Sequence, residues 1–196
     1  MNRTGLIALL LLAGCNAPED TTTPVAAPAA EVETPQAPAP AGAQLTAQGF
    51  GPLRIGMTRA EVEAALGPDS NPEAVGGPEP ESCDIFHPQN APDGLKVMVE
   101  NNVLTSVWLD PGSPVTTDRG VRMGASAAEV RAAYRGGLEA TPHKYEDAPA
   151  EYLFVWSSAD RSSPAARGIK YEIGDDGKLQ RIAGGGPSIQ YVEGCL

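Results

Sequence analysis

Histidine and neighbouring carboxylates are the side chains of this chain that could move protons. His143 stands in TPHKYED beside Glu146 and Asp147, and a histidine next to carboxylates can act in general acid–base catalysis. Asp175 and Asp176 form a second carboxylate pair. A solvated histidine is the commoner finding in so polar a loop, and a hairpin tip accounts for the two aspartates. We therefore expect no catalytic residue, and an enzyme using His143 is the least favoured function.

Two further patterns contain residue types that hold phosphates or metals. GGGP, residues 184–187, has no lysine and no helical pattern after it, so it predicts a turn rather than a phosphate loop. CDIFH, residues 83–87, places a cysteine near a histidine, and His143 is the one other histidine. A structural zinc site needs four ligands at defined spacing. We expect no metal and no cofactor.

The N-terminal sequence MNRTGLIALLLLAGC has the layout of a secretory signal. Arg3 supplies the positive charge, and the apolar run 6–12 is too short to span a bilayer. The ending LAGC resembles the lipobox of bacterial lipoproteins. That resemblance implies a cleaved signal peptide, residues 1–14, and lipidation of Cys15, where several acyl chains give a stable anchor. An ordinary signal followed by an unrelated cysteine is the alternative.

The residues after Cys15 predict where the protein resides. Asn16 stands where lipoproteins retained at the inner membrane of Gram-negative bacteria tend to carry aspartate, so we expect the outer membrane, facing the periplasm, with surface exposure left open. Residues 15–47 are rich in Pro, Ala and Thr and lack aromatic residues. Such a segment cannot bury enough apolar surface to fold. It predicts a disordered tether that could extend up to ~90 Å.

Charge excludes some partners. Loss of Arg3 with the signal takes the net charge from −11 to −12, which argues against nucleic acid and against electrostatic docking on anionic lipid.

Cys83 and Cys195 remain as an even pair, and in an exported protein such a pair favours a disulfide. Two buried thiols or a zinc site are the alternatives.

One sequence pattern occurs twice. RIGMTRAEVEAALG, residues 54–67, returns 68 positions later as RMGASAAEVRAAYR, residues 122–135. Each copy contains the S/T-x-x-E capping box, which predicts the helices Arg59–Leu66 and Ala127–Tyr134. Both copies also contain a glycine two residues before the cap, which predicts a positive φ.

Strand patterns follow each helix. Asn101-Asn102 and GDDG, residues 174–177, predict two hairpin turns. The predicted strands are 83–88, 95–100, 103–109, 151–158, 168–173, 178–183 and 188–195. The fold class is therefore α+β: two tandem repeats, 48–116 and 117–196, each a short helix followed by an antiparallel meander, form one globular unit with the helices on one sheet face.

The first copy, IGMTRAEVEAALG, followed by a polar loop and a hairpin, resembles a repeat shared by two groups of secreted bacterial proteins. One is the small lipoprotein of the outer-membrane β-barrel assembly machinery, the BamE/SmpA/OmlA group. The other is β-lactamase inhibitory protein, which holds two such repeats in tandem. The resemblance covers roughly residues 50–196 and implies binding through a sheet surface and its loops, without catalysis.

Aromatic residues of the strands are the candidate binding side chains. In strand 151–158 the side chains of Tyr152, Phe154 and Trp156 alternate with aliphatic ones, and Trp108 alternates likewise in strand 103–109. Tyr171 lies in a third strand. If the aliphatic side chains form the core, the aromatic ones are exposed and suit a protein partner. The opposite orientation, with the aromatic side chains in the core, is equally compatible with the pattern.

Three functions follow from these observations. The first is a lipid-anchored binding or scaffold protein that engages another periplasmic or outer-membrane protein, as a monomer or within a complex. The second is an inhibitor of a secreted hydrolase. The third, an envelope enzyme, is the least favoured.

Overall fold

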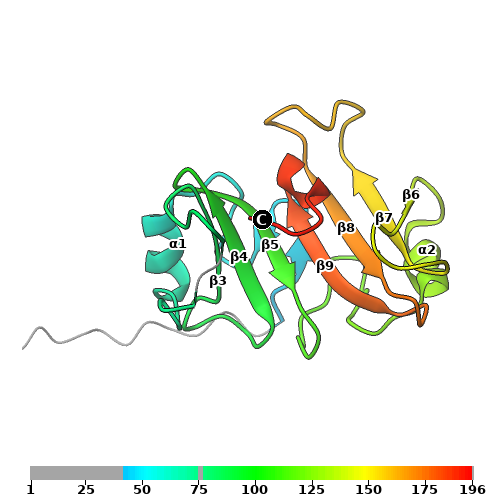
Figure 1. Cartoon of the computed structure of the whole chain (residues 1–196), viewed down its shortest axis with the longest axis horizontal. Coiled ribbons are helices and arrows are strands. Elements are labelled where there is room, and N and C mark those ends of the chain that lie inside the picture. Colours follow the sequence, from blue (N-terminus) through cyan, green and yellow to red (C-terminus); the bar gives the residue numbers. More distant parts are fainter. Residues whose placement is uncertain (1–41, 75–76, 196) are drawn as a thin grey trace, which may run out of the picture. The chain divides into compact units, whose positions relative to one another are not determined.

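A computed structural model of the chain describes residues 42–74 and 77–195. Within them the fold is α+β, with two short α-helices and a seven-stranded antiparallel sheet (Figure 1). A smaller sheet pairs β1 (Leu45–Thr46) with β2 (Gly49–Phe50). The predicted signal peptide, Cys15 and most of the linker lie outside the described residues. In the described part, no helix is long and apolar enough to cross a membrane.

The large sheet has the strand order β3-β4-β5-β9-β8-β7-β6. Its strands are β3 (Cys83–Phe86), β4 (Leu95–Glu100), β5 (Val103–Leu109), β6 (Glu139–Pro142), β7 (Glu151–Trp156), β8 (Gly168–Ile173) and β9 (Leu179–Gly185). At its centre β5 pairs with β9, with Ser106 opposite Gly185 (Figure 1). The predicted strands 95–100, 103–109 and 168–173 are confirmed, whereas β1, β2 and β6 were not predicted.

The two helices, α1 (Arg59–Leu66) and α2 (Ala127–Tyr134), have the predicted bounds. Their N-caps are Thr58 and Ser126, and each hydroxyl accepts the N–H of the glutamate three positions later. That glutamate's carboxylate in turn accepts the N–H of the cap residue. The backbone N–H of the cap residue foremost, and then its hydroxyl, donate to the carboxylate and hold the pKa of both glutamates below the usual value. Both predicted capping boxes are therefore confirmed.

The segments that lead into α1 and α2 make matching contacts with the sheet. The N-cap forms a β-bridge to the start of a hairpin's second strand, and the glycine two residues earlier donates its N–H to the same strand. The bridges are Thr58–Val103 and Ser126–Lys178, and the hydrogen bonds run from Gly56 to Leu104 and from Gly124 to Leu179. Both glycines have the predicted positive φ, 103° and 78°.

The sheet carries a buried cluster on each face. The helix face is lined by aliphatic side chains of alternate strand residues, which pack with Val62, Leu66 and Val130 of the helices and with Leu45 and Phe50. On the opposite face, which we call the aromatic face, the buried members are Met98, Trp108, Tyr152, Phe154, Ala183 and Ile189. Side chains of both helices thus pack against one face of the sheet, and the second cluster shows that the other face is also covered.

Two C-terminal predictions are wrong. Residues 188–195 do not form a strand: η1 (Pro187–Gln190) is a 3₁₀ helix, and the chain then crosses the aromatic face irregularly as far as Cys195. We call residues 187–195 the strap. The predicted turn at 184–187 is wrong as well, because Gly184 and Gly185 belong to β9 and pair with neighbours on both sides. Gly184 and Gly185 allow neighbouring chain segments to lie too close for a Cβ atom, which would stand 2.6 Å from the Thr46 carbonyl oxygen or 2.4 Å from that of Thr105.

Candidate functional site

Strand register determines which side chains the aromatic face presents. Trp108 lies opposite Ala183, Lys170 opposite Phe154, and Glu172 opposite Tyr152, so these residues share one face. Tyr171 points the other way, into the helix-face cluster, where its hydroxyl lies 2.6 Å from that of Tyr134. Tyr171 therefore does not belong to the candidate surface on which the sequence interpretation placed it.

The aromatic side chains are more covered than an open binding surface requires. Trp108 is 4%, Tyr152 5% and Phe154 9% exposed, and the Trp108 indole N–H donates to Ser106 Oγ at 2.6 Å. Trp156 is half-buried and stacks on Phe154 with ring centroids 6.1 Å apart. The alternation is as expected, but of the two orientations considered, the one that exposes Trp108, Tyr152 and Phe154 is contradicted. The strap packs on this face, and the His143 ring also lies against Tyr152.

Charged side chains continue the aromatic face beyond its apolar cluster. Ion pairs join them in sequence: Lys96 to Asp110 at 2.8 Å, Asp110 to Arg181 at 3.1 Å, Arg181 to Glu172 at 3.8 Å and Glu172 to Lys170 at 3.9 Å. We call these five residues the ionic row. It runs over β4, β9 and β8, with Asp110 directly after β5.

The ionic row changes from open to buried along its length. The Lys96 side chain is 46% and the Arg181 side chain 33% exposed, whereas that of Lys170 is 2% exposed. Arg181 also lies over the Trp108 ring, 5.2 Å from its centroid. Burial alone would raise the pKa of Asp110, but hydrogen bonds and charge from Lys96 and Arg181 lower it overall. At the open end of the row, ion pairs therefore hold the Arg181 guanidinium in place over the Trp108 ring.

His143 is not the solvated histidine that its polar loop suggests. Its side chain is 5% exposed and packs against Tyr152, with ring centroids 4.6 Å apart and the rings tilted by 32°. Nδ1 accepts the backbone N–H groups of Tyr145 and Glu146, which places the proton on Nε2, 3.5 Å from a Glu172 carboxylate oxygen. The acid facing His143 is thus Glu172. Both ring nitrogens therefore have partners within the fold: Nδ1 in its own loop and Nε2 on β8.

The remaining carboxylate candidates also have structural roles. Glu146 accepts the backbone N–H of Asp175 at 2.8 Å and so ties its loop to the β8–β9 hairpin. Asp176 is exposed at that hairpin and accepts the N–H of Lys178 at 2.8 Å. The hairpin-tip interpretation of the two aspartates is therefore confirmed.

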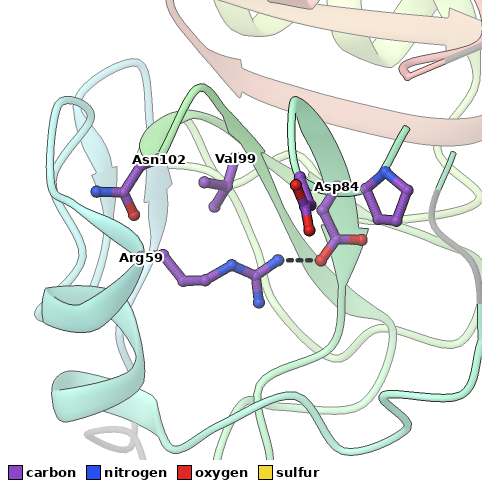
Figure 2. A pocket seen from close by; sticks show the side chains of 6 residues that line it. Arg59, Asp84, Val99 and Asn102 are labelled. Carbon is purple, nitrogen blue, oxygen red and sulfur yellow. Dashed lines mark hydrogen bonds and ion pairs between the residues drawn. The ribbon is translucent and has the colours of Figure 1, made fainter.

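A pocket of about 410 Å³ lies between α1 and the β3 edge of the sheet. Figure 2 shows the Arg59 guanidinium extended towards Asp84, with which it forms an ion pair, while Val99 and Asn102 border the same space. Arg59 also stacks over the Phe86 ring at 4.4 Å and pairs with Glu63 at 3.3 Å. Its charge is therefore neutralised within the fold.

Lys170 is the most perturbed cation of the site. Its Nζ lies 4.7 Å from the Tyr152 ring centroid and donates to the carbonyl of Tyr191 in the strap at 2.8 Å. Burial lowers the pKa of Lys170 to about 8, although Glu172 favours its charge. A buried ammonium costs free energy that an unfolded chain avoids, so this group links stability to pH.

We predict that stability rises with pH through this group. An unfolded lysine keeps its proton up to about pH 10.4, so between the two pKa values the unfolded state binds more protons. Raising the pH from 7 to 9.5 should add about 2 kcal/mol to the free energy of unfolding in urea titrations, beyond whatever other groups contribute. Lys170→Met should lack this increment, and an equal pH slope in both proteins would contradict it.

Comparison of the chain with models of protein families, with curated proteins and with solved structures found no match.

Proposed function

We propose that this chain is a lipid-anchored envelope protein that binds another periplasmic or outer-membrane protein through the open end of its aromatic face. The observation that carries the proposal is Arg181 positioned over Trp108 beside the half-exposed Lys96. Arginine and tryptophan are the residue types on which binding energy concentrates, and ion pairs that fix the guanidinium in advance reduce the ordering cost of binding. The anchor rests on the lipobox resemblance of residues 12–15.

We propose further that the two halves are tandem repeats of one unit. Support comes from the matching capping boxes, the matching bridges before each helix, and the strand order, in which β3-β4-β5 meets β9-β8-β7 at the central pair. This arrangement is compatible with the resemblance to the assembly-machinery lipoprotein and to β-lactamase inhibitory protein, and it would give the chain a continuous binding sheet.

The equivalence of the two halves also favours a second candidate, an inhibitor of a secreted hydrolase. The two candidates differ in what they require. A scaffold would need its anchor to meet a partner at the membrane, whereas an inhibitor would act one-to-one in solution without the lipid. A catalytic function has the weakest support, because His143 is packed and its nitrogens are used within the fold.

The proposal is tested by photo-crosslinking in living cells. A crosslinking amino acid replaces Lys96, with Asp176 on the exposed hairpin as the matched control. We expect one discrete adduct from position 96 in the membrane fraction and none from position 176. Adding Cys15→Ala should remove the adduct from the membranes. Equal protein levels without an adduct at position 96 would contradict binding through this face.

A further inference from the structure

The strap covers the apolar part of the aromatic face by direct contact. Ile189 is fully buried, and Val192 and Cys195 pack against the same cluster at intervals of three residues. Gly194 lies so close that a Cβ there would stand 2.4 Å from Ile85 Cδ1 and 3.4 Å from the Trp108 ring. The strap thus occupies the surface that continues from Arg181 across Trp108.

Few bonds hold the last part of the strap in place. Lys170 Nζ donates to the Tyr191 carbonyl, and the Tyr145 hydroxyl donates to the Glu193 carboxylate. The last backbone bond of the strap joins Tyr191 N–H to Ser188 within the strap itself. Among the described residues, positions 192–195 make no backbone hydrogen bond to the sheet. A third side-chain bond joins Tyr191 to Glu100 of β4. The attachment of residues 191–195 therefore depends on these side-chain bonds, apolar contact and the disulfide.

The disulfide fixes the end of the strap to the edge strand β3. Cys83 and Cys195 are bonded, with Cα atoms 5.4 Å apart, as the sequence predicts. Both cysteines are only partly buried. Thiol–disulfide exchange requires that an external thiolate reach one of the two sulfurs, and partial burial of both residues leaves solvent next to the bond.

We propose that Cys83–Cys195 is a latch, and that its reduction by a dithiol releases residues 191–195 and uncovers Ile85 and Trp108 for the partner. This inference rests on the proposed function and adds its regulation. A thiolate of the dithiol attacks one sulfur, the S–S bond breaks, and a mixed disulfide forms. The second thiol resolves it, so that the dithiol becomes a disulfide and Cys83 and Cys195 each end with a proton.

Release is measured by the exposure of Trp108. The chain has two tryptophans, so Trp156→Phe leaves Trp108 as the sole reporter, and Cys15→Ser in the full chain leaves only the latch cysteines. After dithiothreitol treatment we expect acrylamide quenching of Trp108 to rise about threefold, consistent with local opening. Far-ultraviolet circular dichroism should stay unchanged. Iodoacetamide should label two cysteines, against none before reduction.

Each other outcome overturns the latch. Two labelled cysteines with unchanged quenching would show that the strap stays docked without its bond. Quenching accompanied by loss of the dichroism signal would show that the bond maintains the whole fold.

Cys83→Ser with Cys195→Ser, examined without reductant, should reproduce the reduced protein and excludes an effect of dithiothreitol itself.

The cellular arm separates the latch from the proposed function. A crosslinker at Ile85 should give an adduct in the Cys83→Ser, Cys195→Ser chain and not in the oxidised chain, whereas a crosslinker at Lys96 should react in both. An adduct at Lys96 with no change at Ile85 would keep the binding function and overturn the latch. Release of the strap in the purified protein, with no adduct at either position, would keep the latch and overturn the binding function.

Discussion

Replacing Gly185 by alanine is expected to lower the free energy of unfolding by about 3 kcal/mol, because the new methyl group meets backbone atoms that cannot move aside. A Cβ at this position would stand 2.4 Å from the Thr105 carbonyl oxygen and 2.8 Å from Ser106 Cα. These atoms belong to β5, so relief of the contact would part β5 from β9, the central pair of the seven-stranded sheet.

The adjacent glycine supplies the matched control. At Gly186 the nearest atom to a new Cβ is the same Thr105 oxygen, at 3.6 Å, which is ordinary contact. Its φ of −82° is open to alanine. Gly186→Ala should therefore cost less than about 1 kcal/mol. Urea titrations of both variants measure the two losses. If Gly185→Ala and Gly186→Ala lower the free energy of unfolding by similar amounts, the close contact between Gly185 and β5 does not exclude a side chain.

Local elements were predictable because their signals are local. A capping box is complete within four residues, and two adjacent asparagines with positive φ, 48° and 67°, suffice to turn the β4–β5 hairpin. The glycines of β9 could not be interpreted in this way. Gly185 is needed because of Thr105, which lies 80 positions earlier, and no periodicity within residues 184–187 reveals that contact.

The candidate site was partly predictable for the same reason. Alternation placed Tyr152, Phe154 and Trp156 on one face, but it could not show that the strap covers that face. The apolar contacts of the strap recur at intervals of three residues rather than two, and its end is bonded to β3, a residue pair 112 positions apart. Arg181 was missed as a binding candidate, since its value comes from its position over Trp108, on a neighbouring strand.

Removing the disulfide is expected to cause the largest loss of stability. The bond joins residues 112 positions apart, and in the chain-entropy model the freedom restored to the unfolded chain corresponds to about 4–5 kcal/mol. The Cys83→Ser, Cys195→Ser chain should approach this loss in urea titrations. A loss below about 1 kcal/mol would mean that the unfolded chain is already compact or that the bond opposes native packing.

The rates of folding and unfolding distinguish how the bond acts. If it only restricts the unfolded chain, its removal slows refolding and leaves the unfolding rate unchanged, because every native contact is still present. If it also holds the strap, the native state loses the contacts of Val192 and Gly194 with the aromatic face, and the unfolding rate rises as well. Chevron plots of the oxidised and disulfide-free chains should show both changes if the strap is a latch. A change in refolding alone would mean that the strap remains on the aromatic face without the bond, and that the open row from Lys96 to Arg181 is the whole accessible binding surface.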